Sequence, residues 1–160
     1  MPKLRIYLDT SVISHLFHDD APLLRDATKE FFANTIATSV HNAFISSVVL
    51  DELKRTRDAD LRQSFIDAAR QYGLEMLPEG DEEVDRLADV YMSRGVIPSA
   101  KFEDALHVAF ATIYDMDVLA TWNFRHLAKA RAVQLIGGIN QQEGYAKPLR
   151  ILTPLELLEP

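Results

Sequence analysis

The sequence predicts an α/β fold of three layers (α/β/α), with helices on both faces of a central, mostly parallel sheet of four to five strands. Short runs of β-favouring residues alternate along the chain with longer segments of helical periodicity, which is typical of βαβ units. One short run, 118–121, is almost wholly apolar, as expected of a strand covered on both faces. We expect residues 1–160 to form a single domain, because no repeat, low-complexity tract or linker divides the chain.

The first predicted strand is Leu4–Leu8, in which Arg5 and Tyr7 alternate with aliphatic residues. A helical pattern follows at 12–17, so Asp9 lies at the turn between strand and helix. The other predicted strands are 42–46, 74–77, 118–121 and 149–152. The run 74–77, which ends directly before Pro78, is the candidate for an edge strand.

Six further segments have helical patterns or helix start and stop residues. They are 22–36, 48–55, 58–72, 81–94, 101–114 and 123–142. The segment 81–94 is the clearest, because its apolar residues form one stripe and acids fill its first turn. In 101–114 we expect Phe102 to be buried with the other apolar residues. We expect 123–142 to form one or two short helices broken near Gly137 and Gly138.

Composition narrows the class of protein. The net charge of −7 argues against a broad basic surface for nucleic acid, although acids gathered around a cation would make that count misleading. The chain has no cysteine, which excludes disulfides, a thiolate nucleophile and a thiolate metal site. It has no apolar run of about 20 residues and no signal-peptide pattern, so we expect a cytoplasmic protein with no membrane partner.

Four polar residues from distant parts of the chain are expected at one edge of the sheet. Asp9 ends the first strand, Glu52 lies near the start of the helix after the second, and Asn123 follows the fourth. Asp104 lies in the first turn of the helix that leads into the fourth strand, and crossover helices begin at the edge where strands end. Taken singly, each acid could be only a cap, a helix-dipole residue or a solvated residue. Together they favour a site, because ligands of open α/β sheets bind at this edge.

Three carboxylates in one pocket repel one another, so they ionise fully only around a cation. Carboxylate oxygens select hard cations such as Mg²⁺ or Mn²⁺. Such an ion can activate water and stabilise a phosphate in transfer. The residues alone therefore predict a metal site and favour phosphodiester hydrolysis, without naming a substrate.

Four motifs, in this order, resemble those of the PIN domain family. They are Tyr7-Leu8-Asp9-Thr10-Ser11, Val48-Val49-Leu50-Asp51-Glu52-Leu53, Phe102-Glu103-Asp104-Ala105-Leu106-His107-Val108-Ala109 and Leu119-Ala120-Thr121-Trp122-Asn123. The chain is most similar to the small stand-alone, VapC-like toxins of type II toxin–antitoxin systems. The resemblance implies a PIN-like fold and a divalent-metal-dependent endoribonuclease, which hydrolyses RNA phosphodiester bonds with a metal-activated water. It also implies a cognate antitoxin protein that covers the active site, and a homodimer.

By motif, the resemblance makes Asp9, Glu52 and Asp104 the ligands of Mg²⁺ (or Mn²⁺), with Thr10 or Ser11 in support. These two hydroxyl residues are also candidates for substrate binding.

The fourth motif departs from the family pattern. Many family members have an aspartate two residues after the threonine, where this chain has Asn123 after Thr121. We count Asn123 with the catalytic residues and expect its carbonyl oxygen to hold a metal-bound water without adding charge. One firmly bound ion is therefore expected, and a second could arrive alongside the substrate phosphate.

Several neighbours of the predicted site have two readings. Arg125 and His126 are candidates for contacts to substrate phosphate, although exposed basic residues are often only solvated. We expect His107 to be a packed or hydrogen-bonded helix residue, and Trp122 to be a core residue rather than a base-stacking one. The alternative function is a catalytically weak PIN-fold module that binds RNA or protein. A metal-dependent phosphatase is a third possibility, for which the sequence has no dedicated motif.

Overall fold

The computed structural model describes residues 2–158, which contain a five-stranded sheet of order β3-β2-β1-β4-β5. Every neighbouring pair of strands is parallel. The strands are β1 (Arg5–Leu8), β2 (Asn42–Ile45), β3 (Glu75–Met76), β4 (Val118–Ala120) and β5 (Arg150–Leu152). The predicted α/β fold with a parallel central sheet is confirmed, including the place of β3 at one edge.

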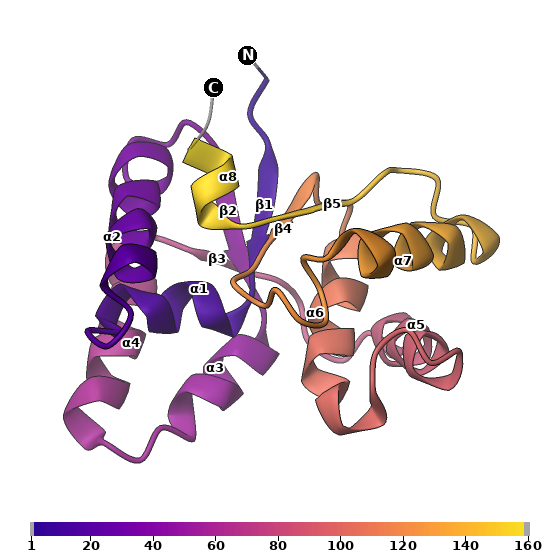
Figure 1. Cartoon of the computed structure of the whole chain (residues 1–160), viewed down its shortest axis with the longest axis horizontal. Helices are drawn as coiled ribbons and strands as arrows, with labels where there is room; N and C mark the ends of the chain where they lie inside the picture. Colours follow the sequence, from indigo (N-terminus) through magenta and orange to yellow (C-terminus); the bar gives the residue numbers. More distant parts are fainter. Residues whose placement is uncertain (1, 159–160) are drawn as a thin grey trace.

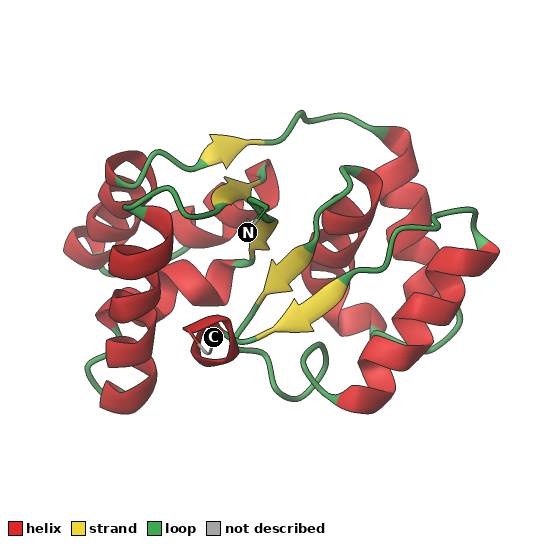
Figure 2. Cartoon of the chain, turned by 90° about the horizontal axis from the view of Figure 1, so that it is seen from above, coloured by secondary structure: helices red, strands yellow, loops and turns green. Residues whose placement is uncertain are grey.

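Helices cover both faces of the sheet (Figures 1 and 2). On one side lie α1 (Thr10–Ser14), the 3₁₀ turn η1 (His15–Phe17), α2 (Pro22–Phe31), the π turn η2 (Phe32–Ile36), α3 (Ser47–Lys54) and α4 (Ala59–Gln71). On the other lie α5 (Glu82–Ser93), the 3₁₀ turn η3 (Ser99–Lys101), α6 (Phe102–Ile113) and α7 (Ala130–Gln142). The last described helix, α8 (Pro154–Leu158), packs against α2. Among the described residues, none of these helices is long and apolar enough to span a bilayer.

Local signals set the helix boundaries close to their predicted places. The carboxylate of Asp58 accepts hydrogen bonds from two N–H groups in the first turn of α4, and Asp81 caps α5 through the N–H of Glu83 (3.0 Å). Gly73 follows α4 with a φ of +62°, a conformation that costs glycine little.

Strand β1 lies in the middle of the sheet and positions the predicted functional edge. Ile6 pairs with Ala43 of β2 on one side and with Val118 of β4 on the other. The N–H of Asp9 continues the ladder past the end of β1, to the carbonyl of Ala120 (3.2 Å). The carboxyl ends of these three strands therefore lie side by side.

Two expectations are wrong. The stretch predicted to break at its glycines holds one helix, α7, which runs through Gly137 and Gly138, with turns before it. Glycines weaken a helix but do not forbid it, and the buried Ile136 and Ile139 on either side of this pair hold α7 against the core. Phe102 is 50% exposed, because it begins α6 outside the packed stripe of that helix.

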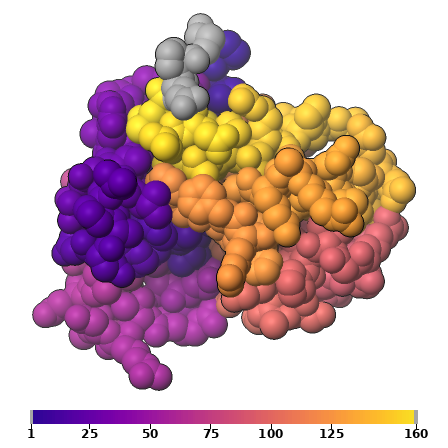
Figure 3. Space-filling model, in the orientation of Figure 1, coloured from indigo at the N-terminus to yellow at the C-terminus, as the bar shows by residue number. Residues whose placement is uncertain are grey.

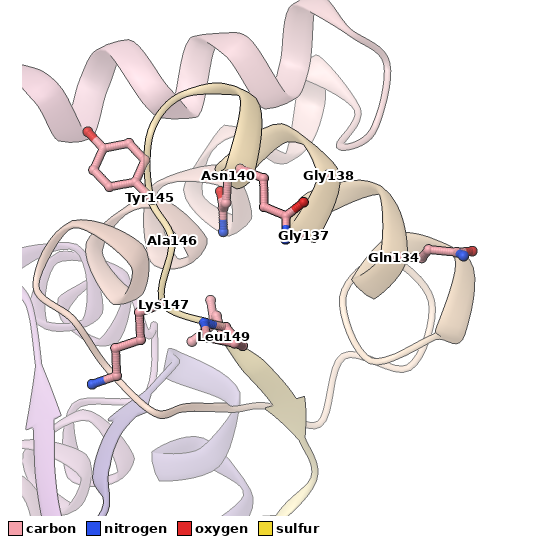
Figure 4. A pocket seen from close by; sticks show the side chains of 10 residues that line it. Gln134, Gly137, Gly138, Asn140, Tyr145, Ala146, Lys147 and Leu149 are labelled. Atoms are coloured by element: carbon pink, nitrogen blue, oxygen red, sulfur yellow. The ribbon is translucent and has the colours of Figure 1, made fainter.

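Gly137 and Gly138 border a cleft of about 350 Å³ between α7 and the segment 145–149 (Figure 4). A methyl group added at either glycine would meet nothing within 4 Å. We expect Gly137→Ala and Gly138→Ala each to raise the free energy of unfolding by about 0.5–1 kcal/mol, since alanine loses less backbone freedom in a helix. Denaturant unfolding monitored by circular dichroism measures the change.

Gly95→Ala is the matched control, because Gly95 has a φ of +72°. Alanine there should lower the free energy of unfolding by about 1 kcal/mol. Destabilisation by both α7 variants would contradict the continuous helix.

Candidate active site

The carboxylate of Asp9 is buried at the tip of β1, with 3% of the residue exposed. It does not cap α1, although Asp9 occupies the N-cap position of that helix. Instead it accepts hydrogen bonds from the hydroxyl of Ser11 (2.5 Å) and from the hydroxyl of Thr121 at the end of β4. The Asp9 carboxylate therefore does not act as a helix cap, and it links the end of β1 to the end of β4.

The same two hydroxyl groups join the first motif to the fourth. Ser11 Oγ accepts the N–H of Trp122 (2.9 Å), and Thr121 Oγ1 accepts the N–H of Asn123 (2.9 Å). Each hydroxyl therefore donates to Asp9 while it accepts from the backbone of the β4–α7 connection. This arrangement fixes where Asn123 lies relative to Asp9.

Glu52, on α3, is held by two hydrogen bonds. One Oε atom lies 2.6 Å from His107 Nε2 on α6 and 2.7 Å from the hydroxyl of Thr10. His107 is 1% exposed, and its Nδ1 lies 2.7 Å from the hydroxyl of Tyr7, which lies 2.7 Å from that of Ser46. The predicted packed and hydrogen-bonded state of His107 is thus correct, and its partner is one of the predicted site acids.

Asp104 pairs with Asn123. The side-chain amide of Asn123 donates to Asp104 Oδ2 (3.0 Å), and its carbonyl oxygen accepts the N–H of His126 (2.9 Å). This carbonyl oxygen thus has one protein partner, and its second lone pair remains for the water that we expect it to hold.

Two adjoining cavities contain every predicted site residue. The first, of about 250 Å³, is lined by Asp9, Thr10, Ser11, Ser14, Glu52, Asp104, His107 and Asn123. The second, of about 410 Å³, is lined by Glu52, Ala100, Lys101, Glu103, Asp104, Asn123, Arg125 and His126. The shared lining residues make them one continuous depression, and Figure 3 shows the surface hollowed where the N-terminal segment meets the segment after β4.

The arrangement of the motifs agrees with a comparison with protein families. The model of the PIN domain matches residues 6–132. The chain belongs to the PIN domain family.

This PIN domain is also similar to a solved structure, the crystal structure of VapBC2 from Rickettsia felis bound to a DNA fragment from their promoter. The sequence identity is 15% and the TM-score is 0.56. The match covers 94% of this chain and 98% of the other. At this identity the likeness shows the fold alone. A comparison with curated proteins gives no match.

The charges of the PIN site repel one another. Burial, together with the neighbouring charge of Glu52, raises the pKa of Asp9, although His107 and the two hydroxyl donors oppose the shift. Burial, together with the charges of Asp9 and Glu52, also raises the pKa of Asp104. Both carboxyl groups therefore ionise less readily than a solvated aspartate.

The contact between Glu52 and His107 shifts the pKa values of the two residues in opposite directions. Burial acts to raise the pKa of Glu52, but the hydrogen bond and charge of His107 and the hydroxyl of Thr10 lower it overall. Burial acts to lower the pKa of His107, but the bond to Glu52 and the surrounding carboxylates raise it overall. The contact with His107 therefore favours the ionised form of Glu52, unlike the two aspartates.

PIN domains are generally nucleases and usually use divalent metal ions. Within residues 2–158, no three Asp, Glu or His side chains are arranged to hold one metal ion. The donors that line the first cavity are nonetheless of the kind that a hard cation takes. A cation between Asp9 and Asp104 would relieve the repulsion that raises their pKa values, whereas Glu52 already has the His107 partner. The site fits a cation in chemistry, with two carboxylates better disposed than the third.

Sequence reasoning missed three polar supports: Tyr7, Ser46 and Thr121. Tyr7 had a usable signal, since it is two residues before Asp9 and side chains two apart on a strand lie on one face. The pairing of its hydroxyl with a histidine 100 positions away had none. Asp117, which precedes β4, lies at the opposite, amino end of the strands, where its carboxylate accepts the N–H of Arg5 (2.8 Å).

The raised pKa of Asp104 predicts a pH-dependent effect of Asp104→Asn. The folded protein retains a proton on Asp104 at pH values where the unfolded chain has released it, so this group lowers stability as the pH rises from about 4 through its raised pKa. In EDTA we expect Asp104→Asn to exceed the wild type in free energy of unfolding by about 1 kcal/mol at pH 8, or roughly 2–4 °C in Tm, and by less at pH 5. Thermal unfolding at both pH values measures this difference.

Asp89→Asn, at an exposed position of α5, should change stability by less than about 0.5 kcal/mol at either pH. A stability difference for Asp104→Asn that shrinks as the pH rises would refute the assigned direction.

Proposed function

We propose that this PIN domain is a divalent-metal-dependent endoribonuclease whose catalytic residues are Asp9, Glu52, Asp104 and Asn123. The observation that carries the proposal is that these four residues, from four separate parts of the chain, line one cavity at the carboxyl edge of the sheet. Residues 1–160 would act as one domain.

Asp9 and Asp104 would hold Mg²⁺ or Mn²⁺, with Glu52 as the third acidic neighbour. When bound, the ion would supply positive charge for the phosphodiester in transfer and lower the pKa of a water nucleophile. Ser11 and Thr121 fix the orientation of the Asp9 carboxylate through hydrogen bonds.

The remaining residues of the site either hold the other two acids in place or would contact the substrate. Thr10 and His107 fix Glu52, and Asn123 holds Asp104. Arg125 and His126 line the second cavity, where their side chains would contact a phosphate next to the one that is cleaved.

The cellular role that we propose is that of a VapC-like toxin of a type II toxin–antitoxin system. The motif resemblance and a fold shared with a VapBC2 structure support this role. Such a toxin would act on RNA in the cytoplasm, would be silenced by a cognate antitoxin protein, and would work as a homodimer.

The second candidate function is a catalytically weak PIN-fold module that binds RNA or protein. The observation in its favour is that Glu52 and Asn123 are both engaged by protein partners. Against it stands the presence of Asp9 and Asp104 in one cavity with raised pKa values, which costs stability and which a binding module has no reason to retain. Turnover decides between the two.

Cleavage of a labelled pool of structured RNAs, in Mg²⁺, Mn²⁺ or EDTA, tests the enzyme. We expect cleavage that requires the metal and falls by at least about 100-fold in Asp9→Asn and in Asp104→Asn, since each removes a charge that the ion needs. Asp89→Asn should cleave as the wild type does.

Two results would count against the nuclease. No cleavage by the folded, antitoxin-free wild type would favour the binding module. Cleavage that persists in both aspartate variants would come from a contaminant or from a different site.

The toxin role has its own test. Induced expression of the wild type in a bacterial host should arrest growth, whereas Asp9→Asn, produced to the same level, should not. Normal growth with an active nuclease present would refute the toxin role and leave the enzymatic proposal standing.

A further inference from the structure

Two histidines lie together where the first helical segment ends. His15 begins the 3₁₀ turn η1, and His18 is the residue that follows this turn. Side chains three residues apart lie almost above one another in a 3₁₀ helix. The two imidazole rings accordingly have centroids 4.3 Å apart, with planes inclined by 43°, and both residues are half-buried. The rings are therefore close enough to present nitrogen atoms to a single small ligand.

The ring of His15 is held in one orientation. Its Nδ1 lies 2.7 Å from the backbone carbonyl oxygen of Ser11, and because a carbonyl oxygen only accepts, this nitrogen carries the proton. The ring also lies against that of Trp122, with centroids 5.9 Å apart. Histidines that bind metal ions commonly donate one ring N–H to a carbonyl group in this way, which leaves the other nitrogen for the ion. In the neutral form of His15 that nitrogen is Nε2.

The imidazole of His15 is also in the protonation state that a metal ion requires. Burial lowers its pKa, and the neighbouring His18 adds to the shift, although the charges of Asp9 and Asp20 oppose it. Within residues 2–158, no carboxylate lies within ion-pair distance of either ring. His15 is therefore mostly neutral at pH 7, with a lone pair that no acid of the described chain engages.

We propose that His15 and His18 together bind one transition-metal ion of the Zn²⁺, Cu²⁺ or Ni²⁺ class, at a site separate from the acid cavity. Imidazole nitrogens suit these ions, whereas Mg²⁺ takes oxygen ligands. Neither histidine lines the two cavities that contain the carboxylates. Two protein ligands leave the other coordination positions to water, so the ion would exchange with solvent, unlike the ion of a four-ligand structural site. The proposal does not depend on the nuclease function.

Two other positions supply matched controls. His41 lies at the amino end of the strands, where its Nδ1 accepts the N–H of Leu4 (3.0 Å), so His41→Gln removes an imidazole remote from the pair. Asp104→Asn reports on ions that bind in the acid cavity. His18→Phe keeps an aromatic ring beside His15 but has no nitrogen, which separates metal binding from ring packing.

Titration of Zn²⁺ and of Cu²⁺ into the tag-free protein, in excess Mg²⁺, tests the proposal. Calorimetry should find a Zn²⁺ site whose Kd rises at least about tenfold in His15→Gln and in His18→Phe. The electron paramagnetic resonance spectrum of bound Cu²⁺ should show nitrogen couplings from two imidazoles in the wild type and fewer in either variant. Zn²⁺ should also raise the Tm of the wild type but not that of the double variant. His41→Gln and Asp104→Asn should match the wild type in all three measurements.

Three results would overturn the proposal. The first is a Zn²⁺ affinity that is unchanged in His18→Phe, or that falls equally in His41→Gln. The second is a Cu²⁺ spectrum of the wild type without imidazole couplings, which would leave the two rings with a packing role only. The third is Zn²⁺ binding that is lost in Asp104→Asn and retained in both histidine variants, which would assign the ion to the acid cavity.

Discussion

The structure depends on the burial of the Asp9 carboxylate at the centre of the sheet. A buried carboxylate is costly unless hydrogen bonds and opposite charge compensate for it. Here Ser11 and Thr121 supply the hydrogen bonds, and the same two hydroxyl groups order the backbone of the β4–α7 connection. The compensation of one acid therefore determines the path of the segment that carries Asn123.

The remaining acids meet this constraint in different ways. Hydrogen bonds with His107 and Thr10 lower the pKa of Glu52, whereas Asp104, which among the described residues has a hydrogen bond from the Asn123 amide, retains a raised pKa. The protein therefore stabilises the charge of Glu52 through its own hydrogen bonds, whereas the charge of Asp104 would be better stabilised by a cation. This division explains why three acids at one edge need not be three equivalent ligands.

Much of the fold followed from the sequence, because strand and helix periodicity and the crossover rule act locally or through topology. That argument brought Asp9, Glu52, Asp104 and Asn123 to one edge without any knowledge of contacts. It could not supply the partner of each side chain, since the bonds of Glu52 and Asn123 depend on rotamers and on tertiary packing. The continuity of α7 through its glycines and the exposure of Phe102 were missed for the same reason: tertiary packing outweighed local preference.

The row of hydrogen bonds from Ser46 through Tyr7 and His107 to Glu52 joins β1, α3 and α6 below the surface. Replacement of His107 alone would leave the glutamate without its main partner, and replacement of Glu52 alone would leave a buried imidazole with only the longer contact from its Nε2 to the Thr10 hydroxyl (3.4 Å). Replacement of both residues together should therefore cost less stability than replacement of either residue alone. Across homologous chains the residues at these two positions should be inherited jointly, so that their covariation would record a bond that neither position reveals alone.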